Sequence, residues 1–461
     1  MLWFGEMNMD STLKINKNEL LFSKSDLKKL IFPLLIEQLL TVTVGVADSV
    51  MVASVGEAAV SAVSLVDSIN ILLFYIFSSI ATGGAVVAGQ YLGGKRPKDS
   101  CRTCDQLLNL LVIVSVAIMI IMYIGRGFIL NTLFGRIEPD VKHYADIYLL
   151  IVFANIPFVA IYCFGAAMFR AMGNTKISMN TSMLMNVINI AGNAILIYGF
   201  HRGVEGVAIP TLVSRVVAAL VIVRLLKNQS LTIHMSEKLN PKLEGEMVKR
   251  ILCIGIPNGV ENSLFQLGKI ILLSFVSGLG TVSVAANAVG NTVCTFQCMP
   301  GMAIGYAVVT VVSHCVGADR YDQAKYYTKK LLKITYILMI IVNVVILALL
   351  PEVVKLYNLS PETGALAEKI LTLHGSFAMV IWPLSFTLPN TLRAANDAKY
   401  TMIVSVISMW TIRIGLGMLM GAYFNLGVIG VWIAMIIDWF VRIIFFVTRY
   451  RNGKWMNLKL I

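Results

Sequence analysis

Two stretches of equal length decide the fold: IFPLLIEQLLTVTVGVADSVMVASVG (Ile31–Gly56) and GIPNGVENSLFQLGKIILLSFVSGLG (Gly255–Gly280). Each is long enough to cross a bilayer as one helix, which takes roughly 20 mainly apolar residues. Each carries a proline near its start, a glutamate one helical turn later, and a glycine at its end. The proline is Pro33 in the first stretch and Pro257 in the second, 224 positions later. The glutamates and the final glycines of the two stretches are separated by the same 224 positions. The chain is therefore predicted to be an internal duplication.

The same spacing, a sequence offset of 224, relates other parts of the two halves. At this offset Gly93 aligns with Gly317, Arg96 with Arg320, and GVEGV (Gly203–Val207) with GVIGV (Gly427–Val431). At an offset of 223, RAMGNTK (Arg170–Lys176) aligns with RAANDAK (Arg393–Lys399). Each half contains an even number of predicted spans, so both enter the membrane from the same side. We therefore expect parallel repeats about an axis normal to the membrane, with a substrate site between them.

Composition restricts the class of protein. Hydrophobic residues make up 57% of the chain and charged residues 14%, against about 25% charged in average soluble domains. The apolar runs are continuous rather than alternating, which argues against a transmembrane β-barrel. We predict an all-α integral membrane protein with twelve transmembrane helices in two parallel six-helix repeats. The predicted spans are 29–53, 60–84, 105–125, 146–169, 178–200, 205–224, 251–277, 284–312, 334–351, 371–392, 401–423 and 428–448.

The net charge of +13 has a simple explanation in such a protein. Cytoplasmic loops of membrane proteins collect Lys and Arg, and most of these residues fall on the side that holds both termini. We therefore expect a multi-pass protein of the plasma membrane with both termini cytoplasmic, acting as a monomer without nucleic acid. The predicted segments are a cytoplasmic N-terminal segment (1–26), an N-terminal lobe (27–224), a cytoplasmic linker (225–246), a C-terminal lobe (247–448) and a cytoplasmic tail (449–461).

One carboxylate stands out inside the predicted spans. Asp48 lies eight residues before the turn at Gly56, about 12 Å deep at about 1.5 Å per residue. Asn189 and Asn193 of span 5 share one helical face, and Thr211 of span 6 lies at a similar depth. These side chains are predicted to form a protonatable pocket or a small-cation site, with Na⁺ as the candidate metal. The alternative is a structural hydrogen-bond cluster between helices.

Other charged residues in the spans have less decisive patterns. Glu37 and its repeat-mate Glu261 are predicted to face a central cavity and attract a cationic substrate, or else to pair with a basic neighbour such as Lys269. In the C-terminal half, Arg413 and Asp438 lie at similar depth on adjacent spans. We predict a structural ion pair between them.

Cofactor and catalytic patterns are weak. The seven cysteines include one CxxC, Cys101 and Cys104, with no second pair, which argues against a zinc site. The histidines show no ligand spacing. We expect no cofactor and no enzymatic activity.

Five motifs stand out: VGVADSVMVASVG (Val44–Gly56), GQYLGG from Gly89, FRAMGNTK from Phe169, NAILIYG from Asn193 and LRAANDAK from Leu392. Together they resemble the multidrug and toxic compound extrusion (MATE) transporters, and the likeness covers nearly the whole chain. The likeness implies two V-shaped six-helix lobes and export driven by a proton or sodium gradient. It also implies that Asp48, Asn189, Asn193 and Thr211 form the coupling site of the N-terminal lobe.

The chain also departs from the family pattern. Many members have Asp where this chain has Asn193, and another branch has an acid where this chain has Gln266, which we assign to the substrate cavity. We expect a secondary antiporter that exports amphipathic organic cations or drugs by alternating access, in exchange for H⁺ or Na⁺. The alternatives are a lipid-linked saccharide flippase, which would use cations such as Arg215, Lys269 and Arg413, and an intramembrane enzyme.

Overall fold

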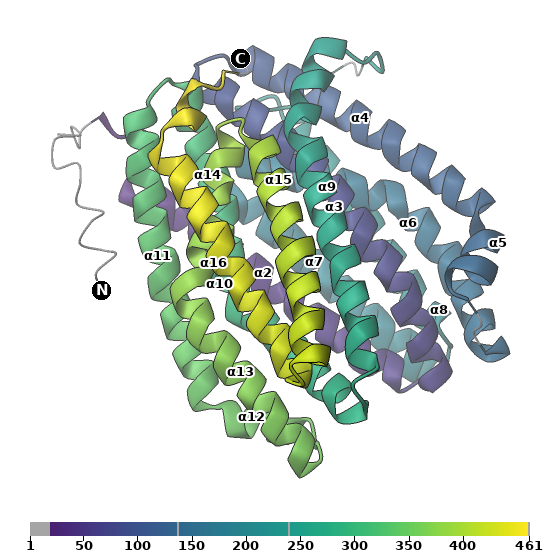
Figure 1. The fold of residues 1–461 in the computed structure, drawn as a ribbon. Helices are drawn as coiled ribbons and strands as arrows, with labels where there is room; N and C mark the ends of the chain where they lie inside the picture. The colour runs from purple at the N-terminus through teal and green to yellow at the C-terminus, as the bar shows by residue number, and fades with distance from the viewer. Residues whose placement is uncertain (1–18, 136–137, 238–239, 460–461) are drawn as a thin grey trace.

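The computed structural model describes residues 19–135, 138–237 and 240–459, and within these ranges its regular structure is entirely helical (Figure 1). The N-terminal half contains α2 (Lys24–Ala53), α3 (Glu57–Gly93), α4 (Pro97–Ile124), α5 (Arg126–Phe128), η2 (Ile129–Leu133), α6 (Pro139–Ala171), α7 (Thr175–Ala194), η3 (Ile195–Gly199) and α8 (Glu205–Leu226). The C-terminal half contains α9 (Gly245–Ser277), α10 (Thr281–Gly317), α11 (Tyr321–Ala348), α12 (Leu350–Leu356), α13 (Pro361–Trp382), η4 (Pro383–Thr387), α14 (Pro389–Ala394), α15 (Ala398–Ser408), η5 (Met409–Leu416), η6 (Leu419–Tyr423), α16 (Gly427–Arg451) and η7 (Lys454–Asn457).

Length and apolar composition qualify 11 helical segments of the described chain as membrane spans. We count the long helix α9 as the twelfth span. It is not among the 11 because polar side chains interrupt its apolar sequence. The predicted all-α fold of twelve spans in two lobes is therefore confirmed. The polar residues of α9 include Asn258, Glu261, Asn262, Gln266 and Lys269, and all of them line the central cavity described below.

The helices repeat with the register that the sequence predicts. Both α3 and α10 have 37 residues and both α4 and α11 have 28, and their first residues are 224 positions apart. The turns before α3 and α10 also match, because Gly56 has φ 135° and Gly280 has φ 96°. Glycine adopts such positive φ values without steric cost. The duplication is thus visible in the backbone as well as in the residues.

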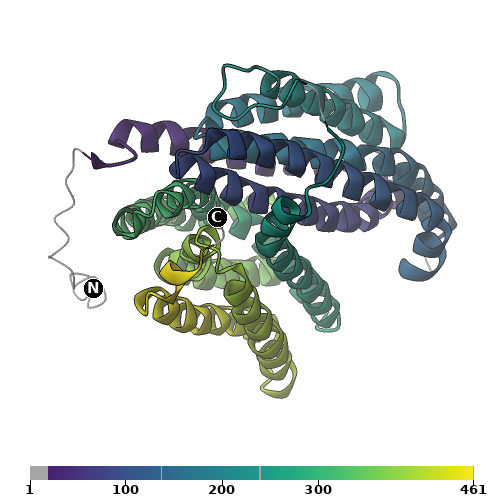
Figure 2. The ribbon, with the colours of Figure 1, turned by 90° about the horizontal axis from the view of Figure 1, so that it is seen from above.

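Two hydrophobic cores define the lobes, and the first helix of each half reaches into the opposite core. Leu27, Leu30 and Leu34 of α2 are buried in the core of the C-terminal half. Ile251 and Ile254 of α9 are buried in the core of the N-terminal half. Accordingly α2 packs on α10 and α9 packs on α3. Figure 2 shows the purple-to-blue lobe on one side and the green-to-yellow lobe on the other.

The lobes approach each other closely where α3 and α10 end, at the side of the molecule where the described chain begins at Glu19 and ends at Lys459. Gly93 and Gly317 are repeat-mates at this crossing. A Cβ on Gly93 would lie 2.0 Å from the carbonyl oxygen of His314, and one on Gly317 would lie 1.8 Å from that of Gln90. Only glycine allows such an approach of one helix backbone to another.

Hydrogen bonds join the lobes at the same end, again in matched pairs. Gln90 Nε2 donates to the carbonyl of Ala394 at 2.9 Å, and His314 Nε2 donates to the carbonyl of Ala171 at 2.8 Å. Gln90 and His314 are themselves repeat-mates at the offset of 224. The end of the molecule where α3 and α10 end is therefore closed by a symmetric set of contacts between the lobes.

We expect Gly93→Ala and Gly317→Ala to destabilise this closed end. The added methyl group meets backbone rather than a movable side chain, so the helices must separate. Overpacking of this kind costs about 1–3 kcal/mol. Thermal unfolding of the purified protein would show a lower midpoint for both variants. Gly45→Ala is the matched control, because a Cβ there meets nothing within 4 Å; an equal effect of all three substitutions would contradict this account of the crossing.

Candidate transport and coupling sites

The four residues predicted for the coupling site lie together in the N-terminal lobe. Asn193 Nδ2 of α7 donates to Asp48 Oδ1 of α2 at 2.7 Å. One turn away on α7, Asn189 Nδ2 donates to Thr211 Oγ1 of α8 at 2.9 Å. Both asparagines are buried, and Asp48 is half-buried. The spacing on α7 thus places both amides on the helix face that meets α2 and α8.

The structure adds a second acid that the sequence analysis missed. Asp67 of α3 interacts electrostatically with Asp48, and Arg215 of α8 lies within the range of both carboxylates. Asp67 Oδ1 accepts hydrogen bonds from Asn70 Nδ2 at 3.1 Å and from the Tyr148 hydroxyl at 3.3 Å. A signal for Asp67 was present in the sequence, since it is a carboxylate inside the predicted span 60–84.

This group of residues, called the N-lobe acidic site, has the chemistry to take up a cation. Two neighbouring carboxylates, Asp48 and Asp67, repel each other unless a positive charge lies between or near them. Carboxylate, amide and hydroxyl oxygens are also the ligands that hard metal cations prefer. The buried Oδ1 of Asn193 has no hydrogen-bond partner within the described chain. The residues present therefore fit either a proton or Na⁺.

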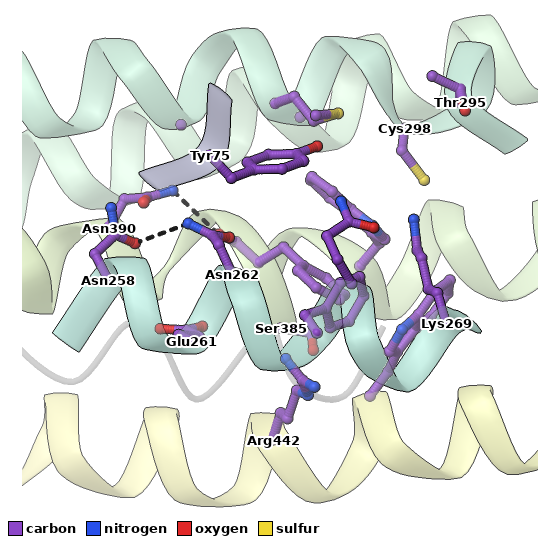
Figure 3. A pocket seen from close by; sticks show the side chains of 18 of the residues that line it. Tyr75, Asn258, Glu261, Asn262, Lys269, Thr295, Cys298, Ser385, Asn390 and Arg442 are labelled. Carbon is purple, nitrogen blue, oxygen red and sulfur yellow. Dashed lines mark hydrogen bonds between the residues drawn. The ribbon is translucent and has the colours of Figure 1, made fainter. Parts of the chain in front are cut away.

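A separate cavity of about 380 Å³ lies between the lobes, and a neighbouring cavity of about 340 Å³ continues from it toward the loop between α9 and α10. Gln266, predicted for the substrate cavity, lines both, and Glu261 lines the first. Figure 3 shows Glu261 and Lys269 on the same helix, with the Lys269 ammonium group pointing into the cavity. The aromatic residues of the first cavity are Tyr75, Phe265, Tyr306, Trp382, Phe386, Trp432 and Trp439.

The two repeat-related glutamates are both paired with arginines. Arg170 Nη1 lies 3.3 Å from Glu37 Oε1, and the Ser178 hydroxyl donates to Glu37 Oε2 at 2.8 Å. Arg393 Nη2 lies 2.7 Å from Glu261 Oε1. The alternative in which each glutamate pairs with a basic side chain is therefore confirmed, and Glu37, held among α2, α6 and α7, lines neither of the two cavities. Neither glutamate offers an unpaired charge to a cationic substrate, and Lys269 is not the partner of Glu261.

Removing one of these glutamate charges should affect stability rather than ligand preference. Glu37→Gln keeps a hydrogen-bonding side chain but leaves Arg170 unpaired, and loss of a charged hydrogen bond costs about 1.5–3 kcal/mol. We expect a lower thermal midpoint and an unchanged ratio of affinities for cationic and anionic ligands. The double variant Glu37→Gln/Arg170→Gln should recover part of the loss, as in a double-mutant cycle. A selective loss of cation binding would instead indicate that Glu37 lines the cavity.

The predicted ion pair between Arg413 and Asp438 is also wrong. Asp438 Oδ1 is bound instead by Arg442 Nε at 3.0 Å and by the Ser408 hydroxyl. Arg442 lies one turn after Asp438 on α16, where helix geometry brings side chains together. Arg413 has no ion pair or hydrogen bond within the described chain, and its Nε is buried without a partner.

Three cations surround one aromatic ring beside the cavity. Lys269 Nζ lies 5.3 Å from the centroid of the Phe265 ring, and the Cζ atoms of Arg413 and Arg442 lie 5.1 Å and 5.8 Å from it. Cation–π contacts contribute roughly 0.5–2 kcal/mol each. A lysine or arginine in the centre of a membrane costs about 2.5–3.5 kcal/mol. The contacts with this ring alone therefore do not offset the free-energy cost of placing Lys269 and Arg413 in the membrane.

Two lobes with matched helices, an acidic site in one lobe and a polar cavity between them are the features of a multi-span membrane transporter. The family model described as MatE matches this chain twice, over residues 33–195 and 257–419. Together these segments cover more than half of the chain, and their starts differ by the same offset of 224 that relates the two halves in the sequence. The chain belongs to the MatE family, and the predicted resemblance is confirmed.

Known relatives agree with this assignment. An uncharacterized transporter of Bacillus subtilis, YisQ, is 27% identical over 438 residues, which are 93% of this chain and 94% of that protein. The probable multidrug resistance protein NorM of Thermotoga maritima is 23% identical, covering 95% of this chain and 94% of NorM. A solved multidrug resistance MATE family transporter in an outward-facing conformation superposes with a TM-score of 0.87, at 20% identity, over 94% of this chain and 96% of that one.

Proposed function

We propose that this protein is a secondary active antiporter that exports an amphipathic organic molecule in exchange for H⁺ or Na⁺ taken up at the N-lobe acidic site. The observation that supports this most directly is the contact between Asp48 and Asn193 beside a second carboxylate, Asp67. Uptake of a cation there removes repulsion between the two acids. If the two lobe arrangements hold these acids at different separations, cation binding favours one arrangement.

The closed end of the molecule supports an alternating-access mechanism. Gly93 and Gly317 close the side where α3 and α10 end, while the cavities continue toward the opposite side at Val276 and Asn287. If both termini are cytoplasmic, as the charge distribution predicts, this arrangement opens to the outside of the plasma membrane. Return to the inward-open state would then require separation of the α3–α10 crossing. Each monomer contains both lobes and thus all the parts that this cycle requires.

The substrate class follows from the central cavity. Its aromatic walls suit a flat or apolar body, and names of relatives such as "multidrug resistance protein" support an organic drug-like substrate. The sequence favours an organic cation on the basis of Glu37 and Glu261. Because arginines neutralise both acids, the charge of the cavity has to be judged from its other residues. Those residues also keep a lipid-linked saccharide flippase as the second candidate.

Transport into inside-out membrane vesicles tests the proposed antiport. Ethidium and 8-anilinonaphthalene-1-sulfonate serve as a fluorescent cation and a fluorescent anion. Each dye is added under a proton gradient alone, a sodium gradient alone, or neither. Accumulation of at least one dye that requires one gradient and collapses with the matching ionophore supports antiport. Accumulation of both dyes at the same rate with every gradient dissipated would contradict it.

A further inference from the structure

The central cavity has an excess of positive charge that its own side chains do not balance. Its lining residues include Lys269, Arg393, Arg413 and Arg442, against one carboxylate, Glu261. Arg393 is paired with Glu261, and Arg442 with Asp438 behind it. Lys269 and Arg413 have no ion pair or hydrogen bond within the described residues. Two basic side chains are thus left facing the cavity without an anionic partner among the described residues.

These two cations lie where the two cavities meet, since both cavities have Lys269 and Arg413 in their linings. Lys269 comes from α9 and Arg413 from the π-helical segment η5, and both groups lie against the same Phe265 ring. Figure 3 shows Lys269 on α9 and Arg442 on α16 among the residues that line the cavity. An ammonium and a guanidinium group held on separate rigid elements form a binding site for an anion with several oxygens.

The duplication relates one member of this cationic group, Arg413, to the N-lobe acidic site. Arg413 is the repeat-mate of Asn189, and Leu272 is the repeat-mate of Asp48, at the offset of 224. The π-helical segments that follow, η3 and η6, begin at positions that differ by the same offset. At these equivalent positions the C-terminal lobe therefore lacks the carboxylate of Asp48 and has a guanidinium group in place of the Asn189 amide.

We propose that the cavity binds the anionic head group of an amphipathic molecule, a phosphate, sulfonate or carboxylate, between Lys269 and Arg413. The apolar body of this molecule lies against the tryptophan-rich wall formed by Trp382, Trp432 and Trp439. This inference rests on the proposed function, because it treats the cavity as the substrate site. It replaces the organic cation by an organic anion as the class of substrate.

Equilibrium binding of matched probes to the purified protein in nanodiscs of zwitterionic lipid tests the inference without any ion gradient. The probes are 2-naphthyl phosphate, 2-naphthylmethanol and (2-naphthylmethyl)trimethylammonium, which share one ring and differ in charge. Isothermal titration calorimetry should show the phosphate binding about tenfold or more tightly than the cation, which is about 1.4 kcal/mol. Equal affinities, or a preference for the cation, would overturn the proposal.

Variants of the two cations locate the site. Lys269→Gln and Arg413→Gln should each weaken binding of the phosphate about tenfold and change binding of the neutral alcohol much less. Lys269→Arg should keep the preference for the phosphate. Arg126→Gln, which removes a cation paired with Asp146 outside the cavity, is the control. If Lys269→Gln and Arg413→Gln both bind the phosphate like the unmodified protein, the site is not the one proposed.

Farnesyl phosphate, added as a competitor, separates two sources of the same head group. Tighter binding of farnesyl phosphate than of 2-naphthyl phosphate assigns the site to a polyprenyl-linked lipid, and the reverse order assigns it to a soluble organic anion. Both outcomes support an anion site. Because these measurements use intact Asp48 and no gradient, their failure leaves the proposed coupling site untouched. Loss of gradient-driven transport alone would instead count against the coupling mechanism.

Discussion

Asp48→Asn is expected to reduce gradient-driven export at least about tenfold while the protein still inserts in the membrane and still binds substrate. The substitution keeps the size of the side chain and its contact with Asn193, which lies 2.7 Å away in the unmodified protein. It removes the charge that binds H⁺ or Na⁺. A side chain of constant charge has no means of transmitting the gradient to the lobe arrangement, since it interacts equally before and after cation uptake.

The controls for this prediction separate coupling from folding. Asp140→Asn removes an exposed carboxylate at the start of α6, so it should leave export unchanged. Asp67→Asn should reduce export as Asp48→Asn does, because Asp67 is the acid that makes uptake of a cation favourable. The measurement is dye accumulation in inside-out vesicles, normalised to the amount of inserted protein. If the Asp48→Asn variant exports dye at the rate of the unmodified protein, the N-lobe acidic site does not couple transport to the gradient.

Asp438→Asn should have the largest effect on stability. Asp438 is fully buried and Arg442 is 2% exposed, and removing one partner of a buried ion pair costs about 3–5 kcal/mol. The loss is comparable with the whole net stability of many proteins, which is about 5–15 kcal/mol. The variant would also leave three cations beside the Phe265 ring without a nearby carboxylate. Thermal unfolding and the yield of folded protein measure this effect.

The same experiment distinguishes the two candidate partners of Asp438. Arg442→Gln should destabilise the protein as strongly as Asp438→Asn, whereas Arg413→Gln should not, because it relieves repulsion within the cationic group. Replacing both partners by apolar residues, Asp438→Leu/Arg442→Met, should be close to neutral for stability. If Arg413→Gln strongly destabilises the protein and Arg442→Gln does not, the ion pair between Arg413 and Asp438 that was predicted from the sequence would be supported instead.

The repeat and the fold could be predicted because they depend on local patterns. A proline, a glutamate and a glycine recur at one fixed sequence offset, and a long apolar run has few alternatives to a membrane helix. The exchange of α2 and α9 between the cores was not predictable from these patterns. It depends on contacts between helices of opposite halves, and a repeat pattern within each half does not specify such contacts.

The N-lobe site was predictable because its residues share a depth and a helix face, and the structure brings Asp48 to Asn193 as expected. Pairing across helices was harder to predict. Arg413 and Asp438 were predicted to pair because they lie at similar depth in the membrane. Arg442 is the nearer partner of Asp438 because the two share a helix. Likewise, the arginines that neutralise Glu37 and Glu261 lie in the repeat motifs RAMGNTK and RAANDAK, far from both glutamates in the sequence.

The central claim is that cation uptake at Asp48 shifts the balance between lobe arrangements. Distances between spin labels on the two lobes measure this balance without knowledge of the substrate. Arg202 and Glu362 are exposed positions before α8 and near the start of α13, on the side away from the termini. The labels would be placed there in a chain whose seven native cysteines are replaced. Electron–electron double resonance would then be recorded at mildly acidic and mildly alkaline pH, with and without Na⁺. With Asp48 intact, the distance distribution should change with pH or with Na⁺, and in Asp48→Asn it should not. An equal response of both proteins, or no response of the protein with Asp48, would contradict the account.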